Sequence, residues 1–407
     1  MGSTRRAVVL SFLAFLSLGL PDGSLGVAWP SLRGSFGVGL SALGTLLAVS
    51  MAGTLISSAS SGALLERLGV GRLLVLSTLL VTASAGLLAA SPSWPWALAS
   101  ALLGGLGAGA VDAGVNAHAA ESFSPRAMTW LHATYGAGAM LGPMLMTAAL
   151  ATGWGWRAGY AALAGLLAAL ALAFARNLSL WTSAPGEGGR PEAGASYALA
   201  SPGSDESEGL RVRPRIALGL FLFFVYTGLE AACGQWAYTF LTEAGNLHTE
   251  VAGLAVAGYW GALGAGRVVF GALAARVPPS TLVRAGVLAS LLSGIALGLA
   301  PGPLAAGALV AMGLALAPVY PLSVSLTPRR VGAARASRVI GWQVSAAYLG
   351  VAFWPFLGGL LAERLGVSVL GAYVAALALL VVLVSEALRT EAGAGHAPVA
   401  SRLDPVP

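Results

Sequence analysis

Long apolar runs recur along this 407-residue chain from one end to the other, and they decide what it can fold into. A helix that crosses the hydrocarbon core of a membrane needs roughly 20 predominantly apolar residues. These runs are continuous rather than alternating, so they predict spanning helices and not barrel strands. The expected fold class is an all-α membrane protein with 12 transmembrane helices, over 7–30, 40–64, 72–90, 96–121, 129–152, 156–178, 214–242, 250–274, 281–300, 302–326, 337–361 and 366–388.

The composition agrees with a chain that is membrane-embedded throughout. Hydrophobic residues make up 57% of it and charged residues only 9%, whereas a soluble domain is about one quarter charged. The net charge of +6 raises the question of nucleic acid, but the arginines lie mostly in short connections between apolar runs. That placement is typical of membrane orientation, so the expected partner is the lipid bilayer and not nucleic acid.

The residues that catalysis or metal binding would need are sparse. The single cysteine, Cys233, excludes a disulfide or a multi-cysteine metal site within one chain. The histidines His118, His132, His248 and His396 are scattered, and no HExxH pair or phosphate-binding P-loop occurs. We therefore expect no cofactor, no metal site and no catalytic residues. A membrane-embedded enzyme or sensor is the less favoured class.

A polar stretch divides the chain nearly in half. Residues 179–213 are rich in Ser, Gly, Pro and Glu, which predicts a flexible linker. It separates an N-terminal six-helix bundle (1–178) from a C-terminal one (214–390), and 391–407 is expected to be a disordered tail. Most arginines fall on the side of the linker and both termini, which the positive-inside rule places in the cytoplasm. The expected location is multi-pass in a bacterial inner (plasma) membrane.

The two halves match at a nearly constant offset. Asp22 aligns with Glu230, and Pro143 with Pro355, each about 210 residues later. Matches that follow in chain order indicate an internal repeat, and six-helix repeats with a substrate site at their interface are a transporter architecture. The sequence thus predicts two pseudo-symmetric bundles that work by alternating access. Because one chain holds both halves, we expect a monomer.

The connection between the second and third predicted helices carries a family resemblance. Residues 62–72 read Gly-Ala-Leu-Leu-Glu-Arg-Leu-Gly-Val-Gly-Arg. This stretch resembles the signature loop of the major facilitator superfamily, which usually has Asp where this chain has Glu66. The resemblance implies the major facilitator fold, with Glu66, Arg67 and Arg72 forming a cytoplasmic latch that gates the two halves.

Two further segments resemble the fucose permease branch of that superfamily. Residues 109–116 read Gly-Ala-Val-Asp-Ala-Gly-Val-Asn, similar to the branch's helix 4 motif, with Asp112 in the acidic place and Ala113 replacing Thr. Residues 226–236 and Arg267 fit the same branch. The resemblance implies a proton-coupled symporter, like the fucose:proton symporter, for a sugar or similar small polar solute. Acids in helices 1 and 4 would take part in coupling.

Four ionisable residues, Asp22, Asp112, Glu230 and Arg267, lie inside apolar runs. A charge at the bilayer centre costs at least ~2.5–3.5 kcal/mol on the insertion scale, so such residues usually face a cavity or a partner. Asp112 is the first candidate for proton coupling, with Asn116 one turn on and on the same face. The alternative for Asp112 is a static hydrogen bond to a neighbouring helix.

Asp22 is the second proton-coupling candidate. It stands between Pro21 and Gly23, where a helix is expected to bend, so its alternative role is to cap a helix break. Glu230 and Arg267 have opposite charges on consecutive helices, which predicts an ion pair with a structural or gating role.

Aromatic and polar side chains on the predicted inner faces are the candidates for substrate binding. Aromatic rings can pack against the C–H groups of a sugar, while amides reach its hydroxyls. For Trp and Tyr the alternative is an interfacial belt, and for His a hydrogen bond between helices. The candidates are Asn116, His132, Tyr135, Gln235, Trp236, Tyr259, Tyr320, Trp342, Gln343 and Tyr348.

The leading hypothesis is a secondary active transporter that couples protons to symport of a sugar or similar small polar solute. Sodium is the alternative ion, because a carboxylate and helix-break carbonyls can coordinate it. The alternative function is a proton-coupled exporter (antiporter) of drugs or metabolites with the same fold and acids. A bulky apolar cavity without clustered amides would favour the exporter.

Overall fold

The computed structural model describes residues 3–122, 125–181 and 206–394, and within these ranges the chain is helical, with turns and no strand. The helices are α1 (Ser3–Phe36), α2 (Ala42–Ala90), α3 (Trp94–Ser122), α4 (Pro125–Ala151), α5 (Gly155–Arg176), α6 (Glu206–Thr239), α7 (Thr249–Leu273), α8 (Pro279–Leu299), α9 (Gly302–Leu316), α10 (Val319–Val331), α11 (Ala333–Leu365) and α12 (Val369–Ala394). A 3₁₀ turn, η1 (Leu178–Trp181), follows α5, and a π-helical turn, η2 (Phe240–Ala244), follows α6.

Two helix breaks differ from those predicted. The predicted helices 40–64 and 72–90 form one element, α2, which changes direction at Gly69. Gly69 has φ 71°, a conformation open to glycine because it lacks a Cβ. The predicted helix 302–326 is divided into α9 and α10 at Pro318, which cannot donate the backbone hydrogen bond of a continuous helix.

The edges of the predicted linker and tail are helical. α6 begins at Glu206, within the predicted linker, and α12 runs to Ala394, within the predicted tail. Residues 182–205 and 395–407, which make up the rest of both segments, lie outside the described residues.

Within the described ranges, nine segments are long and apolar enough to cross a membrane. One of them, 42–90, contains two of the predicted spans. The predicted spans 129–152 and 250–274 correspond to α4 and α7, which are helical but are not among the nine. Leu and Ala dominate these segments and are good helix formers, while the apolar surface suits lipid.

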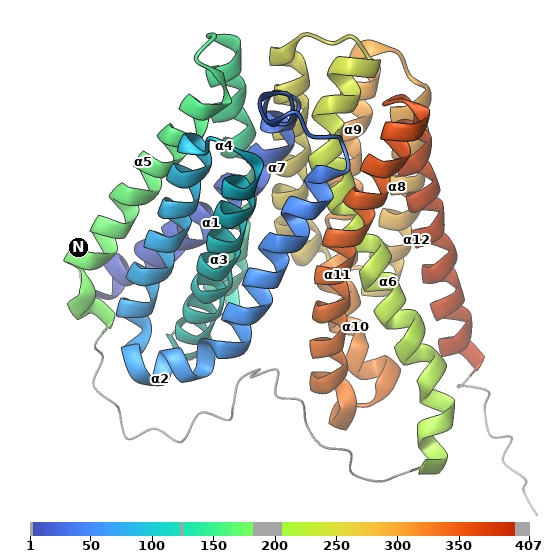
Figure 1. Ribbon diagram of the computed structural model, residues 1–407. Helices are drawn as coiled ribbons and strands as arrows, with labels where there is room; N and C mark the ends of the chain where they lie inside the picture. The colour runs from blue at the N-terminus through green and yellow to red at the C-terminus, as the bar shows by residue number, and fades with distance from the viewer. Residues whose placement is uncertain (1–2, 123–124, 182–205, 395–407) are drawn as a thin grey trace, which may run out of the picture.

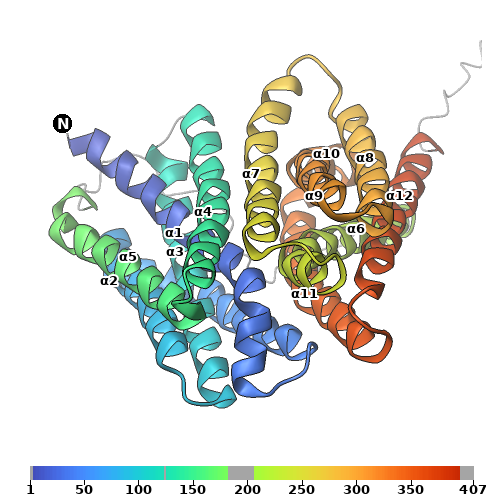
Figure 2. The same ribbon diagram turned by 90° about the horizontal axis from the view of Figure 1, so that it is seen from above.

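The helices gather into two groups, α1–α5 and α6–α12, which Figure 2 shows side by side. In the first group α1 packs on α4, and α2 packs on α3 and α5. In the second group α6 packs on α11, and α8 packs on α9 and α12. The α1–α4 and α6–α11 pairs occupy matching places in the two predicted repeats. Figure 1 shows the same two groups from the side.

The two halves touch mainly along α4 with α7, α2 with α11, and α1 with α6, and α1 also touches α7. The α4–α7 contact is close enough to require glycine. A Cβ built on Gly136 would lie 2.7 Å from the Cα of Gly264 in the other half. Small residues let two backbones approach in this way inside a membrane. These contacts set the halves on either side of a central space.

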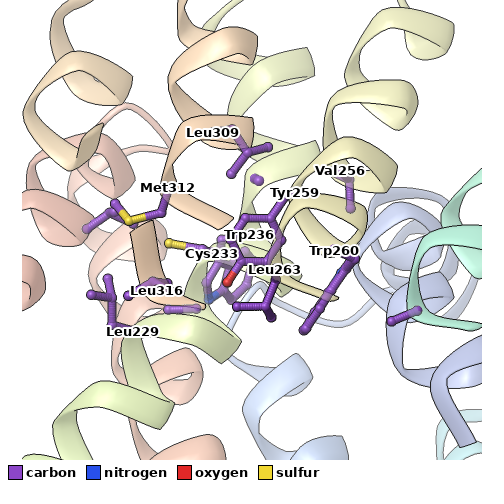
Figure 3. Close-up of a cluster of buried hydrophobic side chains, with 14 of the residues drawn as sticks. Leu229, Cys233, Trp236, Val256, Tyr259, Trp260, Leu263, Leu309, Met312 and Leu316 are labelled. Carbon is purple, nitrogen blue, oxygen red and sulfur yellow. The ribbon is translucent and has the colours of Figure 1, made fainter. Parts of the chain in front are cut away.

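Aromatic side chains are packed into the core of the C-terminal half. Cys233, Trp236 and Tyr259 are buried there among aliphatic side chains of α7, α9 and neighbouring helices (Figure 3). Trp260 lies at the edge of this cluster nearest to the N-terminal half. The core fixes α6 and α7, the two helices that carry most of the polar side chains described next.

Candidate functional site

A cavity of about 400 Å³ lies between the two halves. Its volume is within the range of about 300–1,000 Å³ that small-molecule sites occupy. Both halves contribute to its wall. The lining residues are Leu18, Pro21, Asp22, Leu25, Leu46, Leu47, Ser50, Met51, Val81, Ser84, Ala85, Leu88, Ser100, Ala101, Gly104, Ala108, Tyr135 and Tyr160 from the N-terminal half, and Thr227, Glu230, Ala231, Gln235, Trp260, Arg267, Tyr320, Val344, Ala347, Tyr348 and Val351 from the C-terminal half.

Asp22 presents its carboxylate to this cavity. Its side chain is exposed, and Oδ2 accepts a hydrogen bond of 2.9 Å from the Tyr135 hydroxyl of α4. Among the described residues no arginine forms an ion pair with Asp22. Its backbone carbonyl accepts a hydrogen bond of 3.2 Å from Gln235 Nε2 in the other half. Asp22 is thus an acid in a central cavity, held by a neutral donor.

Glu230 and Arg267 form the ion pair that their opposite charges predict. Arg267 Nη2 lies 3.1 Å from Glu230 Oε2. The Tyr226 hydroxyl donates to the same oxygen at 2.6 Å, and the Tyr259 hydroxyl donates to the Glu230 backbone carbonyl at 2.8 Å. The pair joins α6 to α7 and cancels two charges at the cavity wall.

The cavity brings together part of the predicted site. Of the candidates for coupling, gating and substrate binding, its wall contains Asp22, Tyr135, Glu230, Gln235, Arg267, Tyr320 and Tyr348. The other predicted residues are taken in turn below.

Asp112 and Asn116 are not among the lining residues. They lie on α3 one and two turns beyond Ala108, which does line the cavity. Asn116 Nδ2 donates a hydrogen bond of 3.0 Å to Asp112 Oδ1, as their spacing on one helix face predicts. The Asp112 carboxylate is therefore held by a residue of its own helix, and Asp22 is the acid of the cavity wall that has no arginine partner among the described residues.

Three predicted substrate residues are buried in the C-terminal half. Trp236 donates from Nε1 to the carbonyl of Pro355, and Gln343 accepts from the Thr327 hydroxyl. Tyr259 is buried against Glu230 as described above. Trp342 is exposed and does not line the cavity. His132 belongs to α4, but its side chain lies outside the described residues.

Sequence reasoning missed Trp260 and the aliphatic wall of the cavity. The wall residues recur at helical spacing, as in Val81, Ala85 and Leu88 of α2. The same spacing also marks faces that point into lipid, because both environments are apolar. Helical periodicity could have found this stripe but could not have told a cavity from lipid.

The halves are joined at the end of the bundle away from the linker. Arg33 near the end of α1 forms an ion pair with Glu243 of η2, with Nη2 2.8 Å from Oε1. The Ser41 backbone N–H and hydroxyl both donate to Glu363 Oε1, at 2.8 and 3.0 Å. Both contacts connect one half to the other. We call Arg33, Ser41, Glu243 and Glu363 the far-end latch.

The latch predicted on the linker side is not closed by an ion pair between described residues. Glu66, Arg67 and Arg72 are exposed, and none of them forms an ion pair with another described residue. A Cβ built on Gly62 would meet nothing within 4 Å. Among the described residues, the ion pair between the halves and the bond of Ser41 with Glu363 thus lie at the far end in this conformation.

Loss of the far-end latch is expected to expose the cavity from the far side. The two contacts together are worth about 1–2 kcal/mol, so Arg33→Gln with Glu363→Ala should shift the conformational equilibrium about five- to thirtyfold. The measurement is the labelling rate of Ser50→Cys, a cavity position, by an impermeant thiol reagent added on that side. Arg364→Gln, an exposed arginine of the same end, is the matched control. Equal rates in all three proteins would show that the latch does not hold this end closed.

Comparison with known proteins agrees with this architecture. The family model described as Major Facilitator Superfamily matches residues 8–303. The chain belongs to the major facilitator superfamily. Family membership, the apolar helices and the cavity between two halves point to a multi-pass membrane transporter rather than an enzyme.

Solved structures of this superfamily share the fold. The crystal structure of a variant of the nucleoside transporter NupG superposes with a TM-score of 0.73 at 14% identity, covering 96% of this chain and 100% of that one. At this identity the likeness extends to the fold alone. No curated protein matches the chain.

Proposed function

We propose that this chain is a proton-coupled symporter of a sugar or similar small polar solute, and that Asp22 carries the proton. The observation that supports the proposal most is the Asp22 carboxylate, exposed to the central cavity beside a neutral tyrosine. An acid that faces a cavity inside a membrane is by default a functional group. Asp112 and its Asn116 partner form a second acidic site in the proposal, on α3 beyond the cavity wall.

The proposed mechanism is alternating access. Twelve spans in two six-helix bundles rock about the contacts of α4 with α7 and α2 with α11, which exposes the cavity to each side in turn. Both termini and the linker lie in the cytoplasm, by the distribution of arginines. With its far-end latch closed, the described conformation is then the inward-facing one.

Protonation explains how the proton and solute would move together. A carboxylate carries a full charge through the closed intermediate, at a cost of several kcal/mol, whereas a protonated carboxyl group is neutral. The bundles therefore rock more readily when Asp22 holds a proton. If the solute binds well only to that form, its transport follows the proton gradient.

Uptake by proteoliposomes tests this function. A panel of monosaccharides is offered with the external side acidified, and nucleosides are included because NupG is described as a nucleoside transporter. Acid-driven accumulation that a protonophore abolishes is the expected result. If no member of the panel accumulates with either direction of gradient, the proposal fails.

One observation favours the exporter as the second candidate. The wall of the cavity is largely aliphatic, and Gln235 is the single amide among its described residues. The same assay separates the two functions by sign. A symporter accumulates solute when the outside is acidic, and an antiporter accumulates it when the inside is acidic.

A further inference from the structure

The charged groups of the cavity gather on one side. Asp22 of α1, Glu230 of α6 and Arg267 of α7, with Tyr135 of α4 beside Asp22, belong to four helices that contact one another in turn. Gln235 of α6 and the indole of Trp260 on α7 belong to the same side. We call α1, α4, α6 and α7 the polar side. Hydroxyls of a solute would find charged and amide partners there.

The opposite side is aliphatic. α2 packs on both α3 and α11, and these three helices supply a continuous set of wall residues. We call them the aliphatic side. Its apolar members are Leu46, Leu47, Met51, Val81, Ala85, Leu88, Ala101, Ala108, Val344, Ala347 and Val351.

Two serines on the aliphatic side already donate within the protein. The Ser84 hydroxyl donates to the carbonyl of Ser100, and the Ser100 hydroxyl donates to that of Ala97, both at 2.7 Å. These hydroxyl protons are therefore not free for a solute. The aliphatic side offers a solute little beyond apolar contact, apart from Ser50 and the Tyr348 ring.

The charges of the wall argue against an anion. Arg267 is the cation among the described lining residues, and Glu230 neutralises it. Asp22 adds a group that is either neutral or negative. A carboxylate or phosphate on the solute would lose its hydration without gaining an unpaired cation, which is costly in a cavity of low dielectric.

We propose that the solute is uncharged and two-sided: a hydroxylated ring that contacts the polar side, joined to an apolar ring that packs on the aliphatic side. Aryl glycosides have this chemistry. A cavity of about 400 Å³ has the volume of a site for a drug-sized ligand. Burial of the second ring adds apolar contact that a free monosaccharide lacks. This inference rests on the proposed function and narrows its solute class.

Matched glycoside pairs test the inference. Phenyl and methyl glycosides of glucose, galactose and fucose share the sugar and differ in the apolar ring. Their affinities for the purified full-length protein are measured from ligand-dependent thermal shifts. For at least one sugar we expect the phenyl glycoside to bind about tenfold more tightly or better than the methyl glycoside. The 6-phosphates of the phenyl glycosides of glucose and galactose should bind less tightly than their parent compounds.

Two variants assign the preference to the aliphatic side. Leu47→Asn and Val81→Thr keep nearly the same side-chain size and make the wall polar. We expect each to lower the affinity for the phenyl glycoside several-fold more than the affinity for the methyl glycoside. Their melting temperatures without ligand show whether they fold. If one variant fails to fold, the other still tests the inference.

The outcomes separate this inference from the proposed function. Equal affinities for phenyl and methyl glycosides, tight binding of the phosphorylated derivative, or no binding by any pair would each overturn the two-sided solute. Acid-driven uptake of monosaccharides would still support the proposed function in those cases. Conversely, a phenyl preference without acid-driven uptake would support the solute class and reject proton symport.

Discussion

Asp22→Asn is expected to abolish accumulation driven by a pH gradient while sparing exchange of solute across the membrane. The amide keeps the size and polarity of the carboxyl group but cannot bind and release a proton. One pH unit is worth about 1.4 kcal/mol, which supports about tenfold accumulation at one proton per solute. In the variant this ratio should fall to that seen without a gradient. The measurement is acid-driven uptake and counterflow in the same proteoliposomes.

Asp112→Asn is the matched comparison for this prediction. Asp112 is also an acid within a helix, but it accepts its hydrogen bond from Asn116 and does not line the cavity. We expect Asp112→Asn to retain more of the acid-driven accumulation than Asp22→Asn. The reverse order would move the coupling role to Asp112, the residue that the sequence favours.

Arg267→Met is expected to destabilise the protein strongly. It leaves the carboxylate of Glu230 without its cation. The loss of one partner from a fully buried pair costs about 3–5 kcal/mol, and the side chains of Arg267 and Glu230 are 28% and 17% exposed, so this figure is the upper bound. We expect a markedly lower melting temperature and a poor yield of folded protein. The double variant Glu230→Gln with Arg267→Met removes both charges and should recover much of the loss.

An exposed ion pair provides the control for Arg267. Arg284 Nε lies 2.9 Å from Glu386 Oε1, and the two side chains are about half and one third exposed. Exposed pairs contribute about 0–1 kcal/mol, so Arg284→Met should change the melting temperature little. Similar decreases of the melting temperature in Arg267→Met and Arg284→Met would show that the pair on the cavity wall stabilises the protein no more than an exposed pair does.

Two polar contacts, Glu230 with Arg267 and Asp112 with Asn116, could be predicted from the sequence. Glu230 and Arg267 were paired because two opposite charges in consecutive apolar helices are each too costly to leave alone. The contact between Asp112 and Asn116 follows from a spacing of four residues on a helix. Both predictions depend on helix spacing and on charge, which can be read from the sequence.

The apolar part could not be predicted, because lipid and protein interiors select the same side chains. Trp236 and Trp260 both lie within apolar stretches of the sequence. Trp236 is buried in the core of the C-terminal half, whereas Trp260 lines the cavity. Likewise, nothing near Arg33 in the sequence points to Glu243, which comes from the other half of the chain. The helix boundaries near Gly69 and Pro318 differ from the predicted ones, although the apolar character of both segments is evident from the sequence.

The infrared difference spectrum of the reconstituted protein tests the central claim most directly. A protonated carboxyl group gives a carbonyl stretch that disappears when the group ionises, so a pH step reports which acid titrates. If Asp22 is the proton carrier, the wild-type protein and Asp112→Asn should both show a band that titrates and changes on addition of solute, and Asp22→Asn should lack it. Persistence of that band in Asp22→Asn would contradict the account, because the acid inside the cavity would then not hold the proton.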